Sequence, residues 1–178
     1  TAGAGTVGVD VGLSTYATLS TGEKIANPRH LVKSERRLAR FQRRLSRRQK
    51  GSNNRNKQRL KVAKLHAHVA NQRRDHLHKL TTRLVREKQA IGIESLRITG
   101  MVRNRKLAKH IGDAGWGLFG QLLRYKVVAS QHAVLVVADP LWPSTQRCSC
   151  CGERPVVKLT LKDRRWVCPN CQTEHDRD

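Results

Sequence analysis

Apolar and polar residues alternate at the start of the chain. Val7, Val9 and Val11 fall on one side of an extended backbone, whereas Asp10 falls on the other. This period-two alternation is typical of a strand with one buried face. It predicts a strand that buries its valines and points Asp10 away from them.

A second β-rich run over residues 15–19 is followed by the turn residues Ser20, Thr21 and Gly22 and then by the short run 25–26. Turn-forming residues between two β-rich runs are a hairpin signal. The chain is therefore expected to open with three short strands.

From residue 28 onward the apolar positions recur with a helical period. Between residues 31 and 45 they fall on one arc of a helix, and arginines fill the opposite arc. Turn-forming residues interrupt the pattern at 50–54, and it then resumes from Val62 to Leu84. The pattern predicts two long helices joined by a turn.

Three further elements follow along the chain. Residues 90–94 are expected to form a strand, 116–128 an amphipathic helix, and 133–138, an unbroken apolar run, a fully buried strand. The resulting β-α-β-α-β order predicts an α/β fold.

Charge is distributed unevenly over these elements. The 178 residues include 36 Lys and Arg against 13 Asp and Glu, a formal net charge of +23, which is far more than solubility requires. Ten basic residues lie in 29–50 and eleven in 55–88. With 38% hydrophobic residues, the chain is too apolar for a disordered basic tail. A folded protein with a polyanionic partner is expected.

The two basic runs have two interpretations. A charge run is usually a solvated face, but solvated helices normally alternate the two signs, and Glu35 is the only acid between Arg29 and Lys50. Nucleic-acid contact is therefore favoured. The candidate contacts are Arg36, Arg37, Arg40, Arg43, Arg44, Arg47, Arg48, Arg73 and Arg74.

The sequence shows neither a run of about 20 apolar residues, which a membrane helix needs, nor an opening signal peptide. We expect a cytoplasmic protein with no membrane partner.

Four of the five cysteines form two Cys-x-x-Cys pairs, Cys148 with Cys151 and Cys168 with Cys171, separated by 16 residues. Two such pairs are typical of a tetrahedral zinc site, whereas unrelated free thiols seldom show this spacing. All four ligand positions are cysteines, so the predicted zinc is structural. Cys150 is surplus. Residues 156–161 and 166–167 are expected to supply a hairpin between the pairs.

Two acidic residues stand out because they lie on predicted strands of a basic chain. Asp10 lies on the first strand and Glu94 at the end of the strand 90–94, each opposite a Val or Ile pair. Adjacent strands could bring them together. Convergent carboxylates bind Mg²⁺, and two Mg²⁺ ions activate water for phosphodiester hydrolysis. The alternative is that Asp10 is a solvated or turn-capping residue.

Five segments resemble a known family. The segments Gly8–Leu13, Asn71–Leu80, Ile93–Leu96, Pro143–Gly152 and His175–Asp178 closely resemble TnpB, the transposon-encoded RNA-guided nuclease related to type V CRISPR effectors. The resemblance implies an α/β, RNase H-like (RuvC) mixed sheet with a long basic helical hairpin insertion at about 29–88. It divides the chain into a nuclease core at 1–143, a zinc-ribbon insertion at 144–175 and the start of the last RuvC motif at 176–178.

The same resemblance implies an activity, a metal-dependent endonuclease that cleaves target DNA under the direction of guide RNA in a prokaryotic cytoplasm. It assigns Asp10, Glu94 and Asp178 as Mg²⁺ ligands, with Asp176 as second choice for the third position. The family carries an N-terminal part that grips guide RNA. Guide and target recognition by this chain alone would then be incomplete, and the fragment alone could be inactive.

Two other functions compete with this interpretation. A non-cleaving, zinc-ribbon, Arg-rich nucleic-acid-binding module would share the basic hairpin and the cysteines but would have no use for an acidic triad. A Holliday-junction resolvase is disfavoured, because the zinc ribbon and the hairpin fit guided nucleases better.

Overall fold

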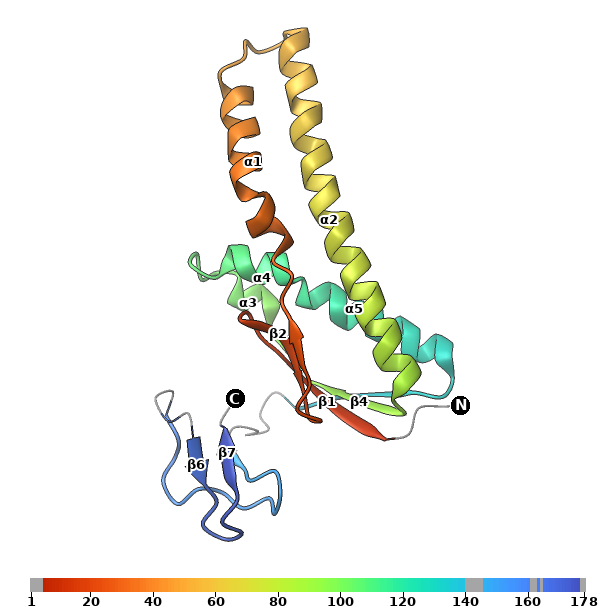
Figure 1. Ribbon diagram of the computed structural model, residues 1–178, viewed down its shortest axis with the longest axis vertical. Helices are drawn as coiled ribbons and strands as arrows, with labels where there is room; N and C mark the ends of the chain where they lie inside the picture. The colour runs from red at the N-terminus through yellow and green to blue at the C-terminus, as the bar shows by residue number, and fades with distance from the viewer. Residues whose placement is uncertain (1–4, 140–145, 161–162, 164, 177–178) are drawn as a thin grey trace. The chain divides into compact units, whose positions relative to one another are not determined.

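The computed structural model describes residues 5–139, 146–160, 163 and 165–176 (Figure 1). The chain divides into two compact units, residues 1–138 and 139–178, and each is considered by itself. The domain boundary predicted at 143 falls outside the described residues.

A five-stranded mixed sheet forms the base of the first unit. Its strands are β1 (Thr6–Val11), β2 (Thr15–Leu19), β3 (Lys24–Ala26), β4 (Ala90–Ile93) and β5 (Val134–Val137), in the spatial order β3-β2-β1-β4-β5. The first three strands form an antiparallel meander, whereas β4 pairs parallel with β1 and β5 pairs parallel with β4. The central strand β1 therefore has an antiparallel neighbour on one side and a parallel neighbour on the other.

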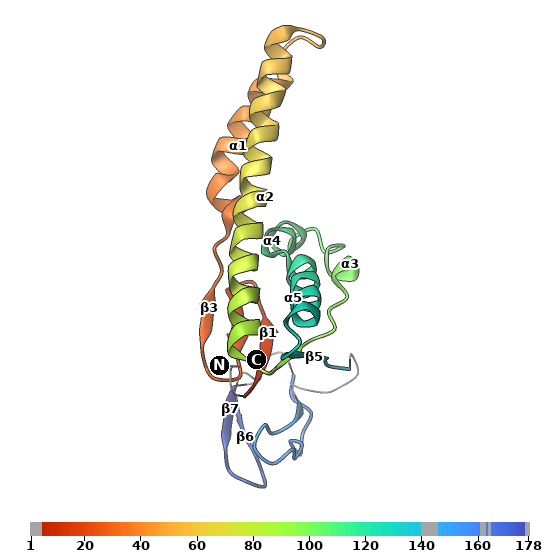
Figure 2. The same ribbon diagram turned by 90° about the vertical axis from the view of Figure 1, so that its right-hand side faces the viewer.

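The described part of this unit contains α1 (His30–Ser46), α2 (Asn53–Glu87), α3 (Ile98–Met101), α4 (Ala108–Ala114) and α5 (Trp116–Ser130). Helices α1 and α2 extend away from the sheet as an antiparallel hairpin, and α5 lies beside the lower part of α2 on the same side of the sheet (Figure 2). None of the described helices is long and apolar enough to cross a membrane.

The core lies between the sheet and the helices α2 and α5. Val7 and Ile91 of the sheet, Leu77 and Leu84 of α2, and Leu123 of α5 are each at most 1% exposed. Burying an aliphatic side chain of this size contributes about 1.5–3 kcal/mol. The valine face of β1 and the apolar face of α2 thus meet in one core, as their periods predict.

Side-chain hydrogen bonds close the far end of the hairpin. Ser52 caps α2 by accepting the Arg55 backbone N–H at 3.2 Å, an interaction typical of helix N-termini. Arg55 also donates from Nη1 to the Leu45 carbonyl oxygen at 2.9 Å, and Gln58 donates from Nε2 to that of Phe41 at 3.0 Å. These bonds tie the end of α1 to the start of α2.

Strand β5 differs from the predicted fully buried strand. Val134 and Val136 are 60% and 53% exposed, although Leu135 packs against the core. The strand lies at the edge of the sheet, and the helices of the first unit gather on one side of that sheet (Figure 2). A continuous apolar run indicates full burial only when both faces are covered, so the prediction of full burial was wrong.

The second unit contains a short hairpin of β6 (Arg165–Val167) and β7 (Glu174–Asp176). The predicted hairpin over 156–161 and 166–167 is wrong in its first strand. The described residues 156–160 form no strand, and Val156 and Val157 are 89% and 77% exposed. The partner of β6 instead follows Cys171, because the turn around the second cysteine pair reverses the chain.

A buried carboxylate joins the hairpin to the rest of the first unit. Asp113 of α4 is 7% exposed, and both of its carboxylate oxygens accept the Leu31 backbone N–H of α1 at 3.0 Å. Arg73 of α2 donates from Nε to the Asp113 carbonyl oxygen at 2.8 Å and lies 3.4 Å from its carboxylate. One residue therefore holds both helices of the hairpin.

Asp113→Ala is expected to lower the free energy of unfolding by about 2–3 kcal/mol. The substitution removes a buried carboxylate that accepts the Leu31 backbone N–H and pairs with the Arg73 guanidinium. Asp75→Ala is the matched control, since it removes an exposed ion pair with Lys79 (2.7 Å) and should cost less than about 0.5 kcal/mol. Urea unfolding followed by circular dichroism measures both variants. Equal losses would contradict the anchoring role.

Candidate functional site

The two predicted strand acids lie at the same edge of the sheet. Parallel pairing aligns Val9 of β1 with Ile93 of β4, and Asp10 and Glu94 are the next residues of these two chains. Both residues are exposed. The register therefore places the two acids on neighbouring strands, at the carboxyl ends of β1 and β4.

The position of Glu94 beside Asp10 changes the pKa of the Glu94 carboxyl group. Its pKa is raised above the usual value, first by partial burial and second by the negative charge of Asp10. Two neighbouring carboxylates resist simultaneous ionisation, and a divalent cation between them would remove that penalty. Carboxylate oxygens are also the ligands that Mg²⁺ prefers. The pair therefore fits a hard divalent cation.

The third predicted Mg²⁺ ligand lies outside the described residues. Asp178 is not described, and of Asp176 only the backbone is described, as the last residue of β7. Both belong to the second unit. The assignment of the third carboxylate therefore stays a prediction.

Glu94→Gln is expected to raise the melting temperature of the metal-free protein at pH 7. A carboxyl group whose pKa is raised by folding destabilises the folded state when it is ionised, so the penalty is present above its folded pKa and disappears as the pH falls through that value. For an exposed pair the gain should be below about 1 kcal/mol, or a rise of about 2–4 °C or less.

Calorimetry in chelator at pH 7 and at pH 3.5 measures this effect, and Glu23→Gln is the control, because it breaks an exposed ion pair with Arg83 (2.8 Å). A Glu94→Gln variant less stable than the parent at pH 7 would contradict the strained carboxylate pair.

The four predicted cysteines converge in the second unit. The sulfur atoms of Cys148, Cys151, Cys168 and Cys171 all lie within 4.8 Å of one another. The Cys148–Cys171 and Cys151–Cys168 pairs are 3.4 and 3.5 Å apart. Tetrahedral Zn–S bonds of about 2.3 Å require sulfurs about 3.8 Å apart. The donors and their spacing therefore fit one zinc ion, whereas Cys150 is exposed and outside the cluster.

Two matching turns hold these sulfurs. After the first pair, the Gly152 N–H donates to the Cys148 carbonyl at 2.9 Å, and after the second pair the Gln172 N–H donates to the Cys168 carbonyl at 3.0 Å. Gly152 and Gln172 both have positive φ, 75° and 58°. A glycine accepts this conformation without strain, so Gly152 was a sequence signal for the first turn, whereas Gln172 gave none for the second.

Hydrogen-bond donors surround the cluster. The backbone N–H groups of Cys150 and Cys151 point at Cys148 Sγ from 3.4 Å. Hydrogen bonding between Cys171 and Thr173 (3.2 Å between Sγ and Oγ1) lowers the pKa of the Cys171 thiol to about 6, whereas burial raises the pKa of the Cys148 thiol. His175 Nε2 lies 3.0 Å from Cys148 Sγ, and its ring packs 5.0 Å from that of Trp166. Such donors support thiolates that bind a metal, yet the sequence pattern did not single out Thr173.

Cys168→Ser is expected to abolish stoichiometric metal binding and to unfold the second unit while the first unit stays folded, because metal binding supplies the folding free energy of small ribbons. Cys150→Ser should retain one zinc ion per chain. Metal analysis and limited proteolysis of residues 146–176 measure both. An unchanged cleavage pattern in Cys168→Ser would refute the structural role of the metal.

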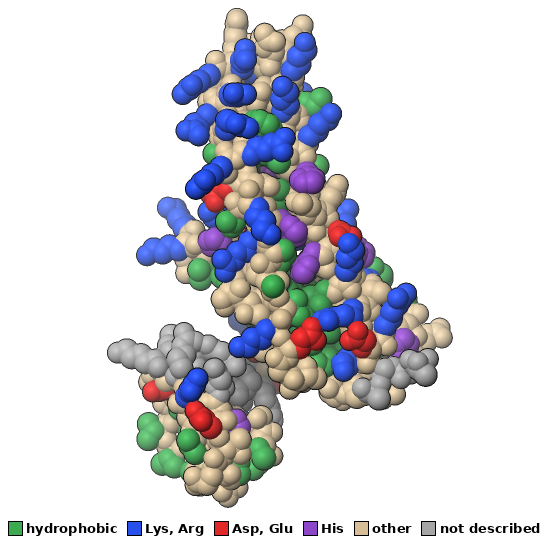
Figure 3. All heavy atoms as spheres, in the orientation of Figure 1, with side chains coloured by type: hydrophobic (Ala, Val, Ile, Leu, Met, Phe, Trp, Pro, Cys, Tyr) green, Lys and Arg blue, Asp and Glu red, His purple; other side chains and the backbone are tan. Residues whose placement is uncertain are grey.

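Many basic side chains gather on the face of the helical hairpin seen in Figure 3. Eight of the nine candidate arginines are exposed: Arg36, Arg37, Arg40, Arg43 and Arg44 on α1, Arg47 and Arg48 after it, and Arg74 on α2. Arg73 is different, since its guanidinium is engaged by Asp113 and its side chain is 24% exposed. The other eight arginines are therefore accessible to solvent.

The fold and these clusters define a mixed α/β protein with a basic helical hairpin and a cysteine cluster that could hold a metal ion. Comparison with known families is more specific. The chain belongs to the OrfB_IS605 family, described as "Probable transposase", whose family model matches residues 1–105. A second family model, "Cas12f1-like, TNB domain", matches residues 116–178. The resemblance to TnpB is thereby confirmed.

Individual relatives agree with this family. The chain is 47% identical over 172 residues to a "Putative RNA-guided DNA endonuclease" of Streptomyces pristinaespiralis, covering 97% of the chain and 42% of the relative. It is 37% identical over 161 residues to "Putative RNA-guided DNA endonuclease InsQ" of Escherichia coli (strain K12), covering 82% and 40%. The chain thus spans less than half the length of these relatives.

Proposed function

We propose that this chain is the metal-dependent endonuclease portion of an RNA-guided, transposon-associated protein that cleaves DNA. The observation that carries the proposal is the β1–β4 register, which sets Asp10 and Glu94 on neighbouring strands of a strongly basic unit. Relatives named as RNA-guided DNA endonucleases support the substrate and the guide. The core is then a RuvC-like sheet.

In this proposal the carboxylates of Asp10, Glu94 and Asp178 hold Mg²⁺, two ions in all. Bound Mg²⁺ supplies the activation of water and the stabilisation of the leaving oxygen in phosphodiester hydrolysis. The raised pKa of Glu94 shows that its ionised form is disfavoured beside Asp10, and a bound cation would relieve this penalty. The site therefore favours metal binding at neutral pH and loses it in acid.

The remaining parts have supporting roles. The exposed arginines of the hairpin contact the phosphates of guide RNA or target DNA, which fixes position but carries little sequence information. The four cysteines hold a structural zinc ion with no ligand position left open. Sequence-specific recognition is assigned to base pairing with the guide.

Asp10→Asn and Glu94→Gln are each expected to lower guide-directed cleavage of a matched duplex by the full-length protein by about 100-fold or more, since each removes a metal ligand worth several kcal/mol in the transition state. Duplex binding should stay level or rise slightly, because a negative charge is removed beside phosphate. Asp75→Asn, an exposed acid on α2, is the control. Parental cleavage by Asp10→Asn would replace this proposal with the non-cleaving binding module.

Replacing Arg40, Arg44 and Arg47 with Gln should weaken nucleic-acid binding and flatten its salt dependence. Each lost phosphate contact lowers the slope of log K against log salt by about 0.7–0.9. The control replaces Arg103, Arg105 and Lys106, which are exposed between α3 and α4, and removes the same charge. Fluorescence anisotropy over a salt series measures both triple variants. Equal slopes in the two would show that the hairpin is only a solvated face.

A further inference from the structure

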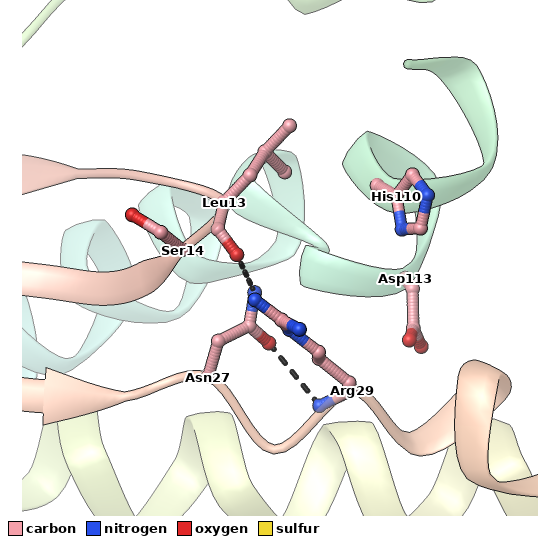
Figure 4. A pocket seen from close by; sticks show the side chains of 6 residues that line it. All are labelled: Leu13, Ser14, Asn27, Arg29, His110 and Asp113. Carbon is pink, nitrogen blue, oxygen red and sulfur yellow. Dashed lines mark hydrogen bonds between the residues drawn. The ribbon is translucent and has the colours of Figure 1, made fainter. Parts of the chain in front are cut away.

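A cavity of about 250 Å³ with both polar and apolar walls lies at the carboxylate edge of the sheet, distinct from the carboxylate pair itself (Figure 4). Leu13 and Ser14 contribute one wall from the turn that follows β1. Because Ser14 is only four residues beyond Asp10, the cavity lies at the same edge as the proposed metal ligands. The other lining residues are Asn27, Arg29, His110 and Asp113.

The backbone of Arg29 is held in a fixed conformation beside this cavity, and the residue itself is exposed. Its backbone has φ 50° and ψ 51°, a left-handed conformation that costs energy for any residue with a Cβ. Asn27 supports it, since Asn27 Oδ1 accepts the Arg29 backbone N–H at 3.2 Å while Nδ2 donates to the Leu13 carbonyl at 2.9 Å. One amide thus links the β1–β2 turn to Arg29, as the dashed lines in Figure 4 show.

The charges of the cavity favour an anionic ligand. The Asp113 carboxylate already accepts the Leu31 N–H and lies 3.4 Å from the Arg73 guanidinium, so its negative charge is compensated by partners other than Arg29. Among the residues that the structure describes, no carboxylate forms an ion pair with Arg29. Its guanidinium and the His110 ring remain as hydrogen-bond donors at the cavity, whereas the Ser14 hydroxyl points away from them (Figure 4).

The start of α1 does not provide the anion site. The backbone N–H of Leu31, which a bound anion could otherwise occupy, is donated to Asp113. Recognition would therefore come from side chains. A guanidinium presents a planar fork of donors that matches two oxygens of a phosphate, and it stays charged at every physiological pH.

We propose that this cavity binds a phosphodiester group of the nucleic-acid strand that passes the carboxylate pair, with Arg29 as the main contact and His110 as an additional donor. The inference rests on the proposed nuclease function and deepens it. A phosphate held here, beside the turn after β1, fixes the strand along the edge where Asp10 and Glu94 lie. Arg29 is then a substrate-positioning residue.

The direct test is binding of a minimal phosphodiester to the 178-residue chain. The probes are d(TpT), r(UpU) and the uncharged methylphosphonate analogue of d(TpT), followed by NMR of the Arg29 Nε–H and the His110 ring. The charged dinucleotides should shift both signals and the uncharged analogue should not. Tighter binding of d(TpT) or of r(UpU) identifies the strand as DNA or RNA. Equal shifts with the analogue, or none with either charged probe, would overturn the proposal.

Arg29→Gly is the sharpest variant, because glycine accepts the left-handed backbone and only the side chain is lost. It should weaken d(TpT) binding about tenfold, the usual effect of one hydrogen-bonded charge, without lowering the melting temperature. Arg86→Ala is the matched control, since Arg86 is exposed near the end of α2, at the opposite, amino edge of β4. It should change binding less than about twofold.

Equal losses in the two variants would show that only general charge attraction acts, and would also overturn the proposal. The outcome is separable from that of the nuclease proposal. Binding of d(TpT) at the cavity requires no cleavage. Normal d(TpT) binding by Arg29→Gly would overturn the cavity proposal, whereas parental cleavage by Asp10→Asn would overturn the nuclease proposal. Either result can occur without the other.

Discussion

The parallel pairing of β1 with β4 is the constraint on which the proposed site depends. Its register is fixed by burial, because Val7 and Ile91 are paired and both are fully buried. A slip of one residue would turn every side chain of a strand to its other face. The apolar contacts of the core therefore fix this register and place Asp10 and Glu94 on neighbouring strands. The favourable free energy of core burial offsets the repulsion between their two carboxylates.

Helix α2 connects this core to the basic surface. Its last turns bury Leu77 and Leu84 against the sheet, while its first turns pack on α1 away from it. Asp113 holds both helices at the point where they leave the core, and the cavity beside Arg29 lies at this junction.

The sequence predicted the elements whose hydrophobic period is clear. It failed where the burial of a strand or a contact between distant residues determines the structure. The alternation in β1 and the helical period of α2 each bury one face, so both were predicted correctly. Strand β5 carries the same apolar run as a central strand, but the helices of the first unit cover one side of the sheet, and Val134 on this edge strand is exposed. The partner of β6 could not be found from the Val156 run, because the turn after Cys168 determines the pairing.

The candidate site shows the same division. The cysteine spacing predicted the sulfur cluster because each Cys-x-x-Cys turn is a local structure. The contact of Arg73 with Asp113, in contrast, joins residues 40 positions apart, and no sequence pattern marks such a contact. Asp10 and Glu94 lie 84 residues apart along the chain. Their meeting could be proposed only from the expectation of adjacent strands, and the parallel register supplies the physical reason.

In the proposed site Asp10 and Glu94 share at least one of the two divalent cations, and titration of the isotope-labelled chain with Mn²⁺ tests this sharing most directly. Paramagnetic broadening should reach the backbone amides of Asp10 and Glu94 at the same low Mn²⁺ ratio, and either Asp10→Asn or Glu94→Gln should remove the broadening at both positions. Broadening at one residue only, or broadening at both that survives either substitution, would contradict a shared site.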